Sequence, residues 1–197
     1  DVETAEFNVH TRVLTLPFWK RASSVVYDML VGHEVGHALF TPDEDWTEKI
    51  DVPQQIVNVC EDARIEKLMK RKYPGLSKTF FNGYKELNDE DFFELEGQNI
   101  NDLNLADRTN LYFKGSSHIS VDFSVEEKEV VDLVGAAETF DEALHASEVL
   151  YKYCVDQQEK EEEEGEEVNI QQELDTGMEG GDRPDLGKDD TEYSEEQ

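Results

Sequence analysis

Basic residues are scarce in this chain, which has 18 lysines and arginines against 48 aspartates and glutamates and a formal net charge of −30. A surface that binds nucleic acid needs clustered lysine and arginine side chains and a basic balance. The nearest basic cluster is Lys67, Lys70, Arg71 and Lys72, at the expected end of a helix, where cations complement the helix dipole. The composition therefore argues against nucleic acid as a partner.

Cysteine and long apolar runs are also scarce. The chain has two cysteines, Cys60 and Cys154, which lie far apart in helical patterns, so we expect free buried thiols. No run of 18 apolar residues and no basic-then-apolar signal segment is present, so we expect a cytoplasmic protein without a membrane partner. The chain begins with Asp1 instead of Met, and we expect it to be a fragment of a longer protein.

Aromatic and basic residues become rare towards the end of the chain. Residues 156–197 contain 18 acidic and 3 basic residues and therefore half of the net charge. Such a segment cannot bury enough apolar surface to fold, and we expect a disordered acidic tail or linker. Residues 1–155 have well-spread aliphatic and aromatic side chains and are expected to form one domain.

The most informative motif is His33-Glu34-Val35-Gly36-His37. Two histidines four residues apart leave the same face of a helix and can share one metal ion. Glu34 can then act as a general base that takes a proton from a metal-activated water as the water attacks a peptide carbonyl. The alternative is that both histidines simply pack in a core helix. The neighbouring positions are all uncharged, as a buried metal site requires: Val31, Gly32, Val35, Gly36, Ala38 and Leu39.

A third protein ligand is expected on the next helix, which the sequence predicts from Gln54 to about Lys72. At 100° per residue Glu61 falls on an apolar stripe, so it is the preferred ligand, whereas Asp62 falls on a more polar stripe and is the reserve. A second possibility is that Glu61 pairs with Arg64 or with a lysine. Asp62, Glu66 or Asn58 could orient the histidines from behind.

The remaining pattern predicts a mostly helical α+β protein with a small N-terminal sheet. Residues 4–16 alternate apolar and polar side chains and are expected to form one strand. Further helices are expected after Ser23 or Ser24, after Ser77, from the capping-box residue Ser124 to Ala136, and from Phe140 to about Gln158. Candidates for stabilising an oxyanion near the metal are Tyr27, Tyr73, Tyr84, Tyr112, His118 and His145.

Residues 27–42 and 61–68, together with 81–87 and 107–114, are similar to the HExxH zinc metallopeptidases encoded by tailed bacteriophages. The similarity covers roughly residues 1–155. It implies a zincin-like fold in which, as in the glutamate zincins, a second helix delivers the third ligand, and a location in the host-cell cytoplasm. The two metal-binding helices more loosely resemble metallopeptidase-like regions that precede von Willebrand A domains in cobaltochelatase-type proteins.

Two functions follow as hypotheses. The first is a zinc-dependent metallopeptidase that hydrolyses a peptide or protein substrate, with His33, His37 and Glu61 holding Zn²⁺ and Glu34 as the base. The alternative is a non-proteolytic metal-binding adaptor linked to a downstream von Willebrand A-type domain. Glu34 favours hydrolysis, because a purely structural site has no need of a general base beside the metal.

Overall fold

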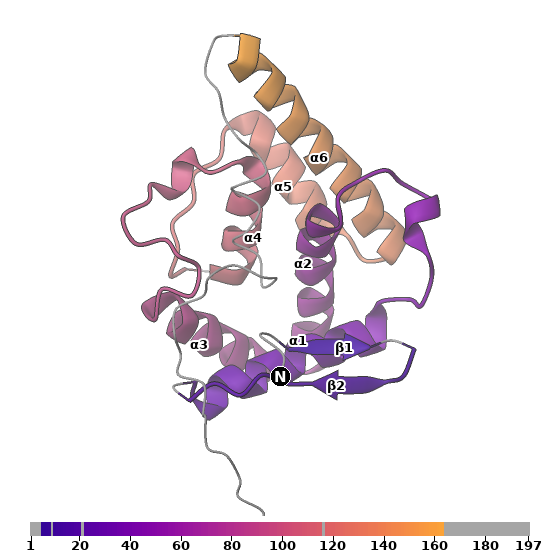
Figure 1. Cartoon of the computed structure of the whole chain (residues 1–197), viewed down its shortest axis with the longest axis vertical. Helices are drawn as coiled ribbons and strands as arrows, with labels where there is room; N and C mark the ends of the chain where they lie inside the picture. Colours follow the sequence, from indigo (N-terminus) through magenta and orange to yellow (C-terminus); the bar gives the residue numbers. More distant parts are fainter. Residues whose placement is uncertain (1–4, 9, 21, 116, 164–197) are drawn as a thin grey trace, which may run out of the picture.

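A computed structural model describes residues 5–163 with the exception of 9, 21 and 116, and the chain is mostly helical within them (Figure 1). The described elements, in chain order, are β1 (Glu6–Asn8), β2 (Val13–Thr15), α1 (Ser24–Phe40), the 3₁₀ turn η1 (Trp46–Glu48), α2 (Gln54–Lys72), α3 (Leu76–Asp89), the 3₁₀ turn η2 (Ile100–Asp102), α4 (Leu105–Gly115), α5 (Val125–Ala136) and α6 (Phe140–Glu163).

The N-terminal segment forms an antiparallel hairpin in place of the single strand expected over residues 4–16, so that prediction was wrong. Strands β1 and β2 pair in the register Glu6 with Thr15 and Asn8 with Val13. The Asn8 side chain accepts hydrogen bonds from the backbone N–H groups of His10 and Thr11 and so closes the turn. The apolar and polar alternation continues through this turn without glycine or proline, which is why the sequence pattern did not reveal it.

Helix α1 begins as the sequence predicts, with Ser23 as its N-cap. The Ser23 hydroxyl accepts hydrogen bonds from the N–H groups of Val25 and Val26 and donates to Glu86 of α3 over 2.6 Å. Farther along, α1 and α3 approach so closely that a Cβ atom at Gly83 would lie 2.7 Å from the Met29 sulfur. The amino end of α1 is therefore anchored to α3.

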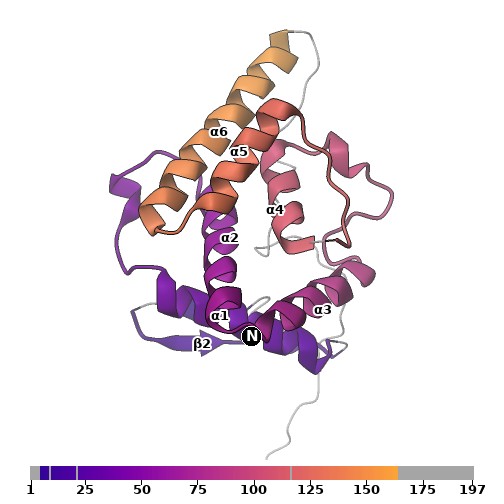
Figure 2. The same ribbon diagram turned by 180° about the vertical axis from the view of Figure 1, so that it is seen from behind.

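Helix α2 has the bounds that the sequence predicts, Gln54 to Lys72. It runs through the middle of the molecule and packs against α1 at one end and against α4, α5 and α6 (Figures 1 and 2). At Gly36 a Cβ atom would lie 2.8 Å from Ile65 Cδ1 and 3.0 Å from Met69 Cγ. The glycine therefore lets α1 pack directly against α2.

Two hydrophobic clusters meet at α2. One cluster joins α2 with α4, α5 and α6 around side chains such as Val57, Val131 and Leu150. The other joins α1 and α3 with the end of α2 around Met29, Phe80 and Tyr84. The contact between α1 and α2 thus lies where the two hydrophobic clusters meet.

The remaining helix predictions were confirmed in part. The capping box at Ser124 is present and α5 ends at Ala136, as predicted. Helix α3 begins at Leu76, so Ser77 is not its cap. Helix α6 continues to Glu163, so the tail expected from residue 156 begins inside a helix. Its remainder, 164–197, lies outside the described residues. No described helix is long and apolar enough to cross a membrane.

Candidate metal centre

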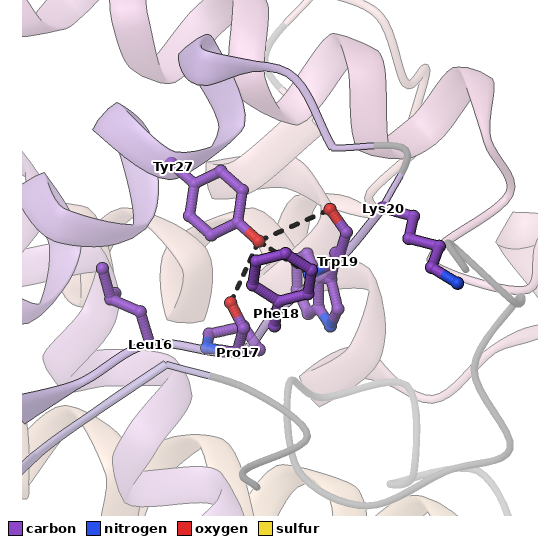
Figure 3. A pocket seen from close by; sticks show the side chains of 6 residues that line it. All are labelled: Leu16, Pro17, Phe18, Trp19, Lys20 and Tyr27. Atoms are coloured by element: carbon purple, nitrogen blue, oxygen red, sulfur yellow. Dashed lines mark hydrogen bonds between the residues drawn. The ribbon is translucent and has the colours of Figure 1, made fainter. Parts of the chain in front are cut away.

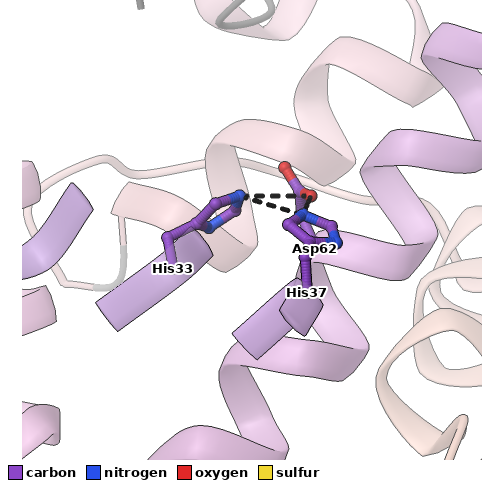
Figure 4. Close-up of side chains that lie close together, drawn as sticks. All are labelled: His33, His37 and Asp62. Carbon is purple, nitrogen blue, oxygen red and sulfur yellow. Dashed lines mark hydrogen bonds and ion pairs between the residues drawn. The ribbon is translucent and has the colours of Figure 1, made fainter. Parts of the chain in front are cut away.

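Helix α1 presents His33 and His37 on one face, one turn apart, towards Asp62 of α2 (Figure 4). The two Nε2 atoms are 3.3 Å apart. Asp62 Oδ1 lies 3.4 Å from Nε2 of His33 and 3.2 Å from Nε2 of His37. Three potential ligand atoms from two helices therefore converge on one point.

Glu61, the preferred third ligand in the sequence analysis, is not part of this group. Its carboxylate accepts hydrogen bonds from Nε and Nη2 of Arg64 at 2.7 and 2.6 Å, and both side chains are about 96% buried. The α2 carboxylate that lies beside both histidines is instead that of the reserve candidate, Asp62. An apolar stripe does not identify the metal-facing side of α2, because this helix packs against neighbours on several sides. The polar stripe of Asp62 and Glu66 faces the histidines instead.

Glu66 sets the orientation of His33 through the Nδ1 atom of its ring. His33 Nδ1 lies 3.0 Å from Glu66 Oε1, which also accepts a hydrogen bond from the Tyr84 hydroxyl. Lys70 forms an ion pair with the other Glu66 oxygen at 3.2 Å. Because a carboxylate only accepts, Nδ1 of His33 must carry the proton, and the Nε2 lone pair is left for a metal.

His37 is oriented through a hydroxyl group. The Thr41 hydroxyl donates to Glu61 Oε1 over 2.5 Å, so its oxygen is available to accept from His37 Nδ1 at 2.9 Å. This relay again leaves the Nε2 lone pair free for a metal. Glu61 thus contacts the side chain that orients His37, whereas the sequence analysis placed it on the metal itself. Thr41 is the C-cap residue directly after α1, and its only sequence signal is that it follows His37 by four residues.

The charges of the centre favour a bound cation. Burial alone lowers the pKa of His33, but the carboxylates of Asp62 and Glu66 outweigh it and raise this pKa to about 10. Burial alone raises the pKa of Asp62, but His33 and Lys114 outweigh it and hold this pKa well below its ordinary value. The same negative potential that favours a proton on the imidazoles favours a metal ion there.

Glu34 follows His33 on α1 and is 7% exposed. Burial is the main cause that raises the pKa of its carboxyl, and His33 and His37 partly oppose the shift. No described residue holds this carboxylate by a hydrogen bond or an ion pair, whereas Glu61, Asp62 and Glu66 each pair with a cation. A buried carboxylate without such a partner beside the candidate ligands is available to accept a proton.

The tyrosine and histidine side chains that were candidates for stabilising an oxyanion either have other partners or lie on the surface. The Tyr84 hydroxyl is engaged with Glu66, so it is not a free donor. The His118 ring lies 4.1 Å from the Phe81 ring, and its Nε2 atom is buried without a hydrogen bond in the described part of the chain. The side chains of Tyr73, Tyr112 and His145 are exposed.

A cavity of about 540 Å³ lies at the amino end of α1 (Figure 3). The Tyr27 hydroxyl donates to the carbonyl of Pro17 at 3.0 Å and accepts from the N–H of Trp19 at 2.7 Å, which fixes the wall of this cavity. The cavity is lined by Leu16, Pro17, Phe18, Trp19, Lys20 and Tyr27. None of the convergent ligand residues lines it, so it is separate from the metal centre.

No family model, curated protein or solved structure matches this chain. The donor set has therefore to be judged by its own chemistry. Two imidazole nitrogens and one carboxylate oxygen form an open three-ligand set, which zinc and other first-row divalent metals accept. The residues present fit a catalytic metal site better than a closed structural one, because no fourth side chain of the described residues joins the group.

Proposed function

We propose that the chain is a zinc-dependent, zincin-like metallopeptidase in which His33, His37 and Asp62 hold the metal and Glu34 is the general base. The observation that carries the proposal is the convergence of both Nε2 atoms and Asp62 Oδ1 within 3.4 Å of one another. The Nδ1 atom of each histidine has its own hydrogen-bond partner. The lone pairs that converge are therefore those of the Nε2 atoms, which a metal needs.

Each residue has a definable task. When bound, zinc supplies the Lewis acidity that polarises a carbonyl group and acidifies water. Glu34 accepts a proton and passes it to the leaving amine, and its raised pKa brings its basicity closer to that of a neutral-pH proton carrier. Glu66 and the Thr41–Glu61 pair hold the imidazoles in the required tautomer. The substrate class that suits this set is a peptide or protein amide.

Metal content tests the ligand assignment. Plasma mass spectrometry of the purified wild type and of Glu34→Gln should find about one zinc per chain, because neither loses a ligand. Asp62→Ala and His33→Ala should lose stoichiometric metal. Glu61→Ala is the matched control on α2: it should keep metal at saturating zinc, since Glu61 reaches the candidate ligands only through Thr41. Full metal in Asp62→Ala together with loss in Glu61→Ala would restore the sequence-based ligand and refute ours.

Peptide hydrolysis tests the role of Glu34. We expect the zinc-loaded wild type to cleave members of a fluorogenic peptide library, and Glu34→Gln to lower kcat by about 10²- to 10⁴-fold while keeping its metal. Stoichiometric metal without cleavage of any peptide in the library would instead favour the non-proteolytic adaptor. Equal activity of Glu34→Gln and wild type would remove Glu34 from the mechanism.

A further inference from the structure

A buried lysine reaches the metal centre from a helix to which the proposed reaction assigns no role. Lys114, in the last turn of α4, has a side chain that is 5% exposed, and its Nζ lies 3.1 Å from Asp62 Oδ2. The other oxygen of the same carboxylate, Oδ1, faces the two histidines. The two oxygens of Asp62 therefore have different partners: one faces a cation of the protein, and the other faces the candidate metal position.

We infer that Lys114 is a positioning residue that makes Asp62 a one-oxygen ligand. The inference rests on the proposed function, since it concerns the metal held there. A carboxylate can bind a metal through one oxygen or through both. An ammonium group 3.1 Å from Oδ2 forms a buried ion pair with that oxygen, and burial keeps water from competing for it. Only Oδ1 then remains for the metal, which leaves room for water and substrate.

The local packing supports a fixed position for Lys114. The next residue, Gly115, lies so close to Ile119 that a Cβ atom there would approach its side chain to 2.6 Å. The end of α4 is thus held against the segment that follows it. The ammonium also compensates the charge of Asp62, as Lys70 does for Glu66. Of these two lysines, Lys114 is the one that contacts a candidate ligand.

Lys67 shows how this chain uses a lysine for structure alone. Its ammonium donates to the carbonyl groups of Gly135 and Ala137 and so caps the carboxyl end of α5. It also pairs with Glu138 at 3.2 Å. None of these partners is a candidate ligand. Replacing Lys67 therefore removes a partly buried ammonium without altering the metal centre, which makes it a control for Lys114.

The test compares Lys114→Met, Lys114→Arg and Lys67→Met with the wild type, all as the full chain. Zinc affinity is measured by competition with a chromophoric chelator, and coordination by the visible spectrum of the cobalt-loaded protein. We expect Lys114→Met to bind zinc about 10-fold more weakly, because Asp62 loses the partner that orients it. Its cobalt bands should lose intensity, because Asp62 can then supply both oxygens and raise the coordination number. Lys114→Arg should recover part of both values, and Lys67→Met should match the wild type.

Each outcome decides between the claims. Unchanged zinc affinity and an unchanged cobalt spectrum in folded Lys114→Met would overturn the inference and leave the proposed function intact. Failure of the wild type to bind metal would overturn both. If Lys114→Met does not fold, the wild-type cobalt spectrum still decides: the strong bands of a four-coordinate ion support a one-oxygen Asp62, and the weak bands of a higher coordination number contradict it.

Discussion

At the scale of single residues, the two histidines of the metal centre are oriented differently. A carboxylate orients one histidine directly, and a carboxylate orients the other through a hydroxyl group. Glu66 accepts from His33 without an intermediary, whereas Glu61 reaches His37 only through the Thr41 hydroxyl. Arg64 in turn holds both oxygens of Glu61. The orientation of His37 thus depends on a chain of three side chains, each of which can be removed separately.

Thr41→Val removes the first member of this chain, the hydroxyl that contacts His37, while keeping the shape of the side chain. We expect about 10-fold weaker zinc binding, since loss of an orienting partner typically costs this much, as measured by chelator competition. Adding Glu61→Gln to Thr41→Val should weaken binding little further, because both act through one path. Thr47→Val, which only breaks an exposed bond to Asp45, is the control. Strictly additive losses would show that Glu61 acts by another route.

The sequence identified His33, Glu34 and His37 as candidates, because their spacing on a helix alone brings them together. It ranked Glu61 above Asp62 as the third ligand, whereas Asp62 is the carboxylate that lies beside both histidines. The ranking used the apolar stripe of α2 as the side that faces the site, but Glu61 is buried because Arg64 neutralises it. Nothing in the sequence pointed to Lys114, because its ion pair with Asp62 depends on how α4 packs against α2.

At the scale of the elements, the distance between α1 and α2 depends on a glycine inside the motif. A Cβ at Gly36 would clash with Ile65 and Met69, whereas a Cβ at Gly32 would meet Phe80 and Leu76 at ordinary contact distances of 3.6 and 3.7 Å. Both glycines precede a candidate ligand histidine by one residue. They therefore allow the same substitution to be compared with and without a steric cost.

Gly36→Ala should destabilise the protein by about 1–3 kcal/mol, since it forces α1 away from α2, and should also weaken zinc binding. Gly32→Ala should be neutral or stabilising by up to about 1 kcal/mol, because alanine favours the helix and fits the space. Chemical unfolding of the metal-free proteins measures both. Equal effects of the two substitutions would mean that close packing at Gly36 does not set the separation of the helices.

The helices were easier to predict than the hairpin for a physical reason. Pro53 and the Tyr73-Pro74-Gly75 sequence mark the ends of α2 locally, and Ser124 and Glu127 mark the start of α5 by bonding to each other's backbone. The turn between β1 and β2 instead depends on one Asn side chain and on Arg12, whose φ is 58°. Such a turn leaves the alternating pattern unbroken.

At the scale of the whole molecule, ion pairs between helices hold a strongly acidic chain together. Arg108 of α4 donates to both oxygens of Glu127 at the start of α5, at 3.1 and 2.5 Å. These hydrogen bonds from Arg108 are the main cause that lowers the pKa of Glu127. Because the folded-state pKa is depressed, the pair stabilises the protein fully above the ordinary value of 4.5 and is lost as pH falls through the lower, folded-state pKa.

Glu127→Gln should therefore lower the free energy of unfolding by about 2 kcal/mol at pH 7. The deficit should shrink as pH falls below about 4.5, because the wild type then loses the same interaction. Urea unfolding of the metal-free proteins between pH 3 and pH 7 follows both values. Glu126→Gln, which removes the same charge from the exposed neighbouring position, should show neither effect. A deficit that is constant with pH would contradict the ion-pair explanation.

The two buried cysteines have a consequence for the chemistry of the intact protein. Cys60 lies two residues before Asp62 and is 0% exposed, and Cys154 of α6 is 6% exposed. Burial raises the pKa of both thiols, that of Cys154 to about 11. Alkylating reagents react with thiolates, so the buried thiols of the native state are protected from them at neutral pH. The alkylation rate of Cys60 thus reports how often the helix that carries Asp62 separates from its neighbours, without any engineered cysteine.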